Sequence, residues 1–219
     1  MVWLGYHGSP VLSRINKSIQ RLKSMASDIR EDLEVFISCA VESSRQVQLF
    51  DELYGDNASV ALLNDMPNTF AIIKLALLKT IVIGICAFFD PKKTRNDENL
   101  SLAYLEEKYQ DRSTAEIAAI IKSARDLYDA LKIAKYRSKY LAHYDLLHFT
   151  KVEKISHDIT TEDLQRLLVM LMSIGLKLSG QQTTAQYVFD TSRLEKDDSG
   201  QSIIRMLAVN RQLKETVTA

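Results

Sequence analysis

The sequence predicts an all-α protein of one domain, built from long antiparallel helices. Only 7 glycines and 3 prolines interrupt its 219 residues, and each proline falls at a plausible helix boundary. Apolar residues recur at alternating steps of three and four, the spacing with which a helix packs lengthwise on a neighbour. No alternation typical of a strand lasts beyond a few residues, and Tyr187 to Phe189 is the one short candidate.

The first helix follows from a heptad seam that begins at Leu12 and runs to Tyr54. The rhythm has a gap at Ser43, so one continuous helix and a helix broken there are both open. Gly55 and the Asp-Asn pair after it end the helix. The apolar members of the seam are Leu12, Ile15, Ile19, Leu22, Ala26, Ile29, Leu33, Phe36, Ala40, Val47, Phe50 and Tyr54.

The second helix is the most apolar part of the chain. Pro67 lies in its first turn, and the helix continues to about Phe89. The residues from Phe70 onward are nearly all apolar, over about the 20 residues that span a bilayer. Lys74 and Lys79 fall near the middle of this segment, however, where charges are costly in lipid. We therefore predict a helix buried on most sides within the bundle.

Two more helices follow a charged loop at Asp90–Asn99. The first is short and covers Leu100–Lys108. The second is capped by Ser113 or Thr114 and begins near Ala115. Its seam includes one polar member, Ser138, and runs through Ile117, Ile120, Ala124, Leu127, Leu131, Ala134, Ser138 and Leu141.

The C-terminal part holds two further helices. Thr160 or Thr161 caps the first, and Gly180 stops it. The segment 181–198 is polar and irregular. A last amphipathic helix around Leu207 follows, which we expect to dock on the bundle or to exchange with a partner chain. The predicted organisation is an N-terminal extension (1–11), the helical bundle (12–180) and a C-terminal extension (181–219).

Charge and cysteine content narrow the classes of protein. The 28 basic and 28 acidic residues cancel, so binding of nucleic acid would depend on a local patch. Cys39 and Cys86 lack further ligands at zinc spacing, and we expect both to be buried thiols in a reducing cytoplasm. The first residues lack the features of a secretion signal. The sequence contains no glycine-rich phosphate loop and no zinc-peptidase or serine-hydrolase motif, so neither a metal nor a cofactor is expected.

The one clearly basic region runs from Lys132 to Lys154. Tyr136, Tyr140 and Tyr144 are interleaved with its charges, and aromatic faces beside cations suit single-stranded nucleic acid. The alternative is a solvated helix face whose tyrosines cover the edge of the core. The region holds Lys132, Lys135, Arg137, Lys139, Lys151 and Lys154 with His143 and His148, against only Asp145 and Glu153.

The run Arg-Ser-Lys-Tyr-Leu-Ala-His-Tyr-Asp at 137–145 resembles the signature of HEPN domains, an arginine followed a few residues later by a histidine. The chain is most similar to the abortive-infection type U (AbiU2-like) HEPN group. Members of this group resemble one another in having a long helix, an apolar helix, a Phe-Phe-Asp turn, a short helix and then the Arg-to-His segment. Here the turn is Phe88–Asp90 and the short helix begins at Ser101. The similarity extends over about residues 12–180.

The resemblance implies a HEPN-like bundle that works as a two-fold homodimer, with two Arg/His sets facing one cleft. It implies a metal-independent endoribonuclease of a prokaryotic defence or toxin–antitoxin system, in which the 2′-OH of RNA attacks the neighbouring phosphate. His143 would move a proton near neutral pH, and Arg137 would hold the phosphate. An antitoxin or a modifying enzyme is a further candidate partner. Residues expected to support the site or to bind RNA are Lys135, Ser138, Lys139, Tyr140, Tyr144 and Asp145.

Helical geometry separates Arg137 from His143. Six residues at about 100° each place them roughly 240° apart on an ideal helix, so they do not share a face. Either the helix ends near Leu141 and His143 turns back, or the other subunit completes the pair. Tyr144 does share the face of Arg137 and is a second candidate contact to phosphate or base.

Two other functions remain open. The first is a non-catalytic HEPN-like module that binds RNA, a nucleotide or a protein. There His143 would satisfy carbonyls at a helix end, and Arg137 would pair with Asp145 or Glu153. The second is a purely structural dimer held by the seam from Leu12 to Tyr54.

Overall fold

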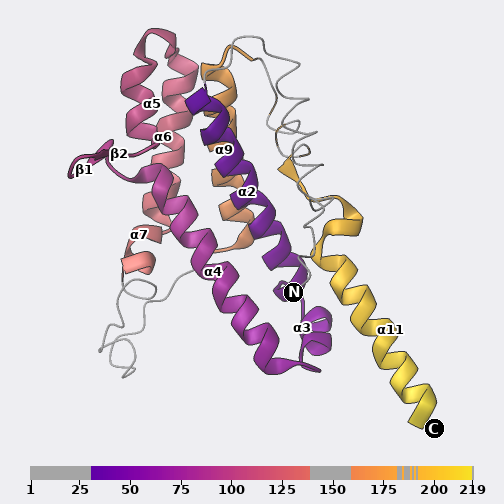
Figure 1. The fold of residues 1–219 in the computed structure, drawn as a ribbon. Coiled ribbons are helices and arrows are strands. Elements are labelled where there is room, and N and C mark those ends of the chain that lie inside the picture. Colours follow the sequence, from indigo (N-terminus) through magenta and orange to yellow (C-terminus); the bar gives the residue numbers. More distant parts are fainter. Residues whose placement is uncertain are drawn as a thin grey trace, which may run out of the picture.

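The computed structural model describes residues 31–138 and 159–218, except 182–183, 185–187, 189 and 191. These residues form a helical bundle with one short hairpin, which confirms the all-α prediction (Figure 1). The elements are α2 (Glu31–Tyr54), α3 (Asn57–Leu63), α4 (Pro67–Phe89), β1 (Lys93–Thr94), β2 (Asp97–Glu98), α5 (Leu102–Lys108), the 3-10 helix η1 (Gln110–Arg112), α6 (Ala115–Ala130), α7 (Ile133–Tyr136), α9 (Thr161–Leu178), the 3-10 helix η3 (Lys196–Asp198) and α11 (Gly200–Thr218).

Helix α2 is the element around which the bundle is built. It runs unbroken through Ser43 and packs against both α9 and α4. The described part of its heptad seam faces these two helices within the same chain. That part of the seam is therefore not available to hold two copies together, whereas the part at 12–30 lies outside the described residues. The fully buried members of the described part are Leu33, Phe36, Ala40 and Val47.

Small residues let α2 approach its two neighbours closely. A Cβ atom on Gly175 of α9 would lie 2.6 Å from Cγ1 of Ile37. On α4, a Cβ atom on Gly84 would lie 3.2 Å from Oγ of Ser43. Ser43, the polar interruption of the seam, is thus a small side chain at the place where α4 crosses α2.

Helix α4 is far more exposed than the sequence predicts. Ile72, Leu75 and Ile83 are 69%, 51% and 52% exposed, and we call these three residues the α4 apolar face. The prediction of a helix buried on most sides is wrong, because the described chain supplies neighbours for one side only. By length and composition α4 could cross a membrane. In a bilayer, however, the charges of Lys74 and Lys79 would lie in lipid, which costs free energy. The sequence of α4 therefore fits a helix of a soluble protein better than a membrane-spanning helix.

Three short elements, α3, β1 and β2, occur where the sequence predicts no helix or strand. The Asp56 carboxylate accepts hydrogen bonds from the backbone N–H groups of Ala58 and Ser59, at 2.8 and 2.9 Å, and so caps α3. Strands β1 and β2 pair within the predicted loop, with Arg95 at φ 57° between them. Elements this short bury too few apolar side chains to leave a periodic pattern in the sequence.

The helix expected to run from Ala115 to Leu141 is broken at Lys132, whose φ is 54°. This left-handed residue ends α6 and starts α7 in a new register. The change buries Ile133 and Tyr136 and exposes Ser138. Placing Ser138 on the apolar seam was therefore wrong, because a heptad count holds only while the helix is continuous.

Other predicted boundaries are confirmed. The hydroxyl oxygens of Thr114 and Thr160 accept hydrogen bonds from the first turns of α6 and α9, at 3.3 and 3.1 Å. Pro67 opens α4. Gly180, with φ 90°, follows the end of α9 in the left-handed conformation that glycine adopts readily.

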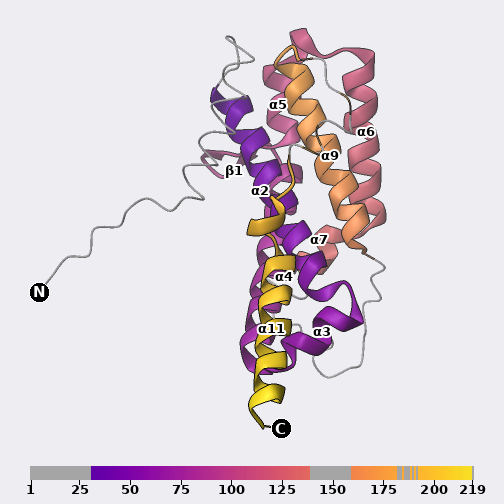
Figure 2. The same cartoon turned by 90° about the vertical axis from the view of Figure 1, so that its right-hand side faces the viewer.

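The last helix, α11, docks on its own chain, which is one of the two expected arrangements. It lies along the lower end of α2 and against α3, as Figure 2 shows. Arg211 of α11 also pairs with Asp65, with Nη2 and Oδ1 2.6 Å apart. The apolar residues that meet in this contact include Leu53, Leu63, Phe70, Ile203, Ile204 and Leu207.

The two cysteines differ in their surroundings. Cys86 is fully buried, as predicted, whereas Cys39 is exposed. The expectation of a buried Cys39 was wrong because it lies on a side of α2 that the described neighbours leave open. Both thiols are free.

Candidate functional site around Arg137

The candidate site forms where α4 and α7 end. Arg137 is the C-cap residue of α7, and Asp90 is the C-cap residue of α4. Nη1 of Arg137 donates to Oδ1 of Asp90 at 3.2 Å. Their side chains are 38% and 34% exposed, so solvent reaches this ion pair. The contact joins positions that are 47 residues apart in the chain.

Helix electrostatics explain why this pair is favourable. The C-terminal end of a helix carries a partial negative charge, which favours a cation and disfavours a carboxylate. The 23-residue helix α4 ends beside Asp90, so its partial negative charge disfavours that carboxylate, and the Arg137 guanidinium offsets this repulsion.

Cys86 and Tyr128 lie next to the ion pair. The Tyr128 hydroxyl donates to Sγ of Cys86 at 3.3 Å, and its ring stacks on Phe89 with centroids 4.0 Å apart. Burial raises the pKa of the Cys86 thiol and of the Tyr128 phenol. Burial by itself lowers the pKa of Arg137, but interactions with Cys86 and Asp90 raise it above its ordinary value. Arg137 is therefore a permanent positive charge at a partly exposed helix end.

A hollow of about 300 Å³ opens beside this pair, and we call it the α4–α6 hollow. Asp90 belongs to both features, because it lines the hollow and holds Arg137. Arg125 and Asp129 of α6 are its other charged residues, and Arg125 pairs with Glu106 of α5. Within the described residues, no three His, Cys, Asp or Glu side chains come together as a metal site would require. The remaining lining residues are Phe89, Pro91, Leu102, Ala103 and Tyr128.

A comparison with known families tests the HEPN resemblance that the Phe-Phe-Asp turn and the Arg-to-His run indicate. The family model described as AbiU2 (HEPN_AbiU2) matches residues 19–201. The chain belongs to this HEPN family. The matched region contains both Asp90 and Arg137. No curated protein and no solved structure shows a significant match to the chain.

The structure describes three of the residues that the sequence assigns to the site of this AbiU2-type HEPN domain. Arg137 pairs with Asp90, Lys135 is exposed on α7, and Ser138 is exposed in a wider turn of π type that follows α7. The predicted catalytic His143 lies outside the described residues. The same holds for Lys139, Tyr140, Tyr144 and Asp145.

Sequence reasoning missed Asp90 as the partner of Arg137. The partners expected for a structural arginine were Asp145 and Glu153, which lie outside the described residues. The available signal was the Phe-Phe-Asp turn of the HEPN resemblance, which ends with Asp90. Tyr136 is only 7% exposed and so covers the core, as the alternative interpretation of the interleaved tyrosines expects.

Proposed function

We propose that this HEPN domain is a metal-independent endoribonuclease of a prokaryotic defence or toxin–antitoxin system, acting in the cytoplasm as a homodimer. The observation that carries the proposal is the Arg137–Asp90 pair, an oriented and partly exposed cation in the family's Arg-to-His segment. A charge held in this way suits a phosphate whose oxygens become more negative during the reaction.

The proposed reaction is an internal transfer of the phosphodiester. The 2′-oxygen of one nucleotide forms a bond to phosphorus while the bond to the 5′-oxygen of the next nucleotide breaks. The 2′-OH loses its proton and the departing 5′-oxygen gains one, so the products are a 2′,3′-cyclic phosphate and a 5′-OH. We assign this proton transfer to His143, whose ordinary pKa lies near neutrality.

Arg137 would bind the phosphate while Asp90 keeps the guanidinium in place. The guanidinium has five N–H donors, and among the described residues one hydrogen bond, from Nη1, goes to Asp90. The other donors can therefore meet two phosphate oxygens. Asp90 is a positioning residue in this scheme, because it acts through Arg137.

The α4 apolar face is where we place the second copy of the chain. A helix of this length spans about 35 Å, enough to form a substantial part of an interface that buries roughly 800 Å² per partner. Ile83 lies seven residues before Asp90, about 10 Å along the helix axis, so a copy seated on this face would lie near the Arg137 site at that end. This arrangement agrees with the two-fold dimer that the HEPN resemblance implies.

Cleavage of a mixed RNA pool in EDTA tests the proposed chemistry. We expect the wild type to leave cyclic phosphate ends, and Arg137→Ala and His143→Ala each to cleave at least about 100-fold more slowly. Lys122→Ala is the matched control, because it removes an exposed cation on a different helix, α6, and it should keep full activity. Full activity in Arg137→Ala would overturn the assignment.

A non-catalytic binding module is the second candidate function. The same ion pair and hollow favour it, since together they can hold the phosphate and the base of a nucleotide without any proton transfer. In that case the wild type binds RNA with an affinity that falls steeply as salt rises, yet leaves it intact. Protein partners such as an antitoxin or a modifying enzyme would then account for regulation.

A further inference from the structure

The α4–α6 hollow combines an aromatic wall with charges of both signs. Tyr128, stacked on Phe89, supplies the wall. Arg125 and Asp129 are four residues apart on α6, so they project from the same side of that helix, and both line the hollow. This gives a planar ligand a surface to stack on, one group that donates hydrogen bonds and one that accepts them.

The size of the hollow limits what it can hold. Its volume of about 300 Å³ is at the lower end of the range for ligand pockets, which runs from roughly 300 to 1,000 Å³. A single planar ring system fits this space better than a complete nucleotide. Because Asp90 links the hollow to Arg137, the sugar and phosphates of such a ligand would continue toward the guanidinium.

The two charged residues of α6 that line the hollow, Arg125 and Asp129, can meet a ligand at modest cost. Asp129 is exposed. Arg125 is 45% exposed and its partner Glu106 is 38% exposed. A surface ion pair of this kind contributes little to stability, so exchanging Glu106 for a ligand costs little.

Among the RNA bases, guanine matches this pair of groups. Its Watson–Crick edge presents two neighbouring N–H donors to a carboxylate, while O6 and N7 accept from an arginine. Adenine carries an amino group where guanine has O6, so it would turn a donor toward Arg125. Uracil and cytosine lack the fused ring that bears N7.

We propose that the α4–α6 hollow binds an unpaired guanine of the RNA substrate, with Asp129 on the Watson–Crick edge, Arg125 on O6 and N7, and Tyr128 under the ring. This inference rests on the proposed function in so far as RNA is the ligand. It adds a specificity site, and it places the cleaved phosphate beside a guanine. Stacking and edge contacts of this kind are how proteins read single-stranded RNA.

Binding of short fluorescent RNAs to the full-length His143→Ala protein tests the proposal without cleavage. The probes are an oligoadenylate, the same strand with one central guanosine, and strands in which inosine or 7-deazaguanosine replaces that guanosine. We expect roughly 5- to 150-fold tighter binding of the guanosine strand than of oligoadenylate. Inosine, which lacks the amino group read by Asp129, and 7-deazaguanosine, which lacks N7, should each lose part of this preference.

Two variants in the same background locate the preference. Asp129→Ala should remove the difference between the guanosine and inosine strands, and Arg125→Ala should remove the effect of 7-deazaguanosine. Asp126→Ala is the control and should keep both differences, because Asp126 is exposed on the same helix but does not line the hollow.

The outcomes separate this inference from the proposed enzyme. Cleavage by the wild type combined with equal binding of all four strands overturns the guanine site and leaves the ribonuclease standing. Guanosine preference that depends on Asp129 supports the site even if the wild type cleaves nothing. Absence of binding to every strand overturns the guanine site, whereas cleavage by the wild type is judged separately.

Discussion

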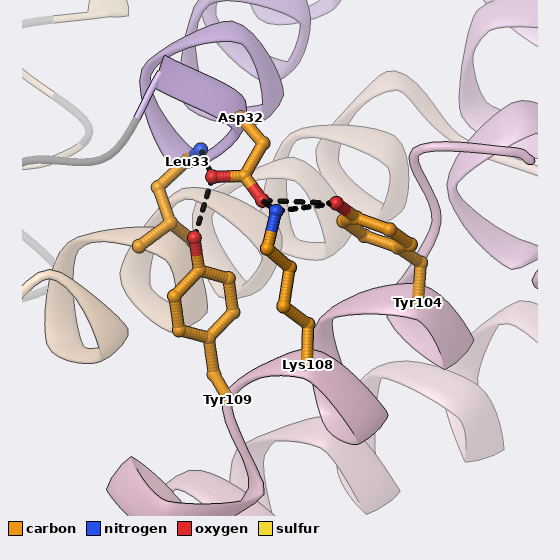
Figure 3. Close-up of polar contacts among 5 residues, drawn as sticks. All are labelled: Asp32, Leu33, Tyr104, Lys108 and Tyr109. Atoms are coloured by element: carbon orange, nitrogen blue, oxygen red, sulfur yellow. Dashed lines mark hydrogen bonds and ion pairs between the residues drawn. The ribbon is translucent and has the colours of Figure 1, made fainter.

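Asp32 connects α2 to α5 and to the residue after α5 through polar contacts of its side chain. It lies in the first described turn of α2, and its carboxylate accepts hydrogen bonds from the hydroxyls of Tyr109 at 2.5 Å and Tyr104 at 3.2 Å (Figure 3). Nζ of Lys108 lies 2.6 Å from the same carboxylate. All three partners follow the start of α5, so Asp32 ties the start of α2 to that helix and the residue after it. Burial by itself raises the pKa of Asp32, but these partners lower it below its ordinary value.

We predict that Asp32→Asn lowers the free energy of unfolding at pH 7 by about 1–2 kcal/mol, because the charged acceptor of these hydrogen bonds is lost. The folded state has the lower carboxyl pKa. The stabilisation from the ionised Asp32 carboxylate is therefore fully present above the ordinary pKa of a carboxyl group. It is lost as the pH falls through the lower pKa of the folded state. Urea unfolding followed by circular dichroism at pH 7 and pH 3 measures both effects.

The control for this prediction is Asp126→Asn, which changes an exposed carboxylate whose ion-pair partner among the described residues is Lys122 on the same helix. It should leave stability nearly unchanged at either pH. If Asp32→Asn retains the whole pH dependence of the wild type, Asp32 is not the group responsible.

At the scale of the elements, α4 is an apolar helix that leaves large apolar side chains exposed. Its sequence is apolar almost all round, yet α2 and the helix ends near Asp90 cover one side only. A periodic pattern tells how many sides of a helix are apolar. It does not tell whether the cover comes from the same chain or from a second one.

We predict that Ile83→Asp converts the proposed dimer into a monomer, because a charge on the α4 apolar face would be buried without a partner in the interface. Light scattering coupled to size-exclusion chromatography measures the mass. Met206→Asp, at an exposed apolar position of α11 with 65% exposure, is the matched control and should remain a dimer. A wild-type protein that is monomeric at micromolar concentration would contradict the dimer.

The wild type and Ile83→Asp should also differ in RNA cleavage. If the partner copy contributes to the Arg137 site, Ile83→Asp loses RNA cleavage together with the dimer. An active monomer would show that one chain carries the complete site.

At the scale of the whole molecule, the spacing of α2 and α9 sets the geometry of the core. Gly175 is a point of close approach, since an added Cβ would lie 2.6 Å from Cγ1 of Ile37. Helices this close transmit a small change in one side chain to the position of the next helix, because the interior is tightly packed.

We predict that Gly175→Ala lowers the free energy of unfolding by about 1–3 kcal/mol, as overpacking of a well-filled core usually does. Chemical denaturation provides the measurement. Adding Ile37→Ala to this variant should cost less than Ile37→Ala costs in the wild type, because it removes the atoms that the new methyl group meets. Simple additivity of the two changes would argue against the close contact.

The sequence by itself determined the features that local physics controls. The spacing of apolar residues, the caps at Thr114 and Thr160, and the turn at Gly180 act over a few residues, so the all-α class and most helix boundaries could be predicted. The Arg-to-His segment likewise indicated the family, because its residues are close together in the chain. The break at Lys132 could not be predicted in this way, since the apolar rhythm continues across it.

Only the tertiary structure decided which distant residues meet. The Arg137–Asp90 pair, the hollow that Asp90 shares with Arg125 and Asp129, and the exposure of the α4 apolar face all depend on how α4, α6 and α7 are placed. No periodic signal connects positions 47 residues apart. Their proximity follows from the packing of the helices as a whole, because the core around α2 fixes where α4, α6 and α7 lie.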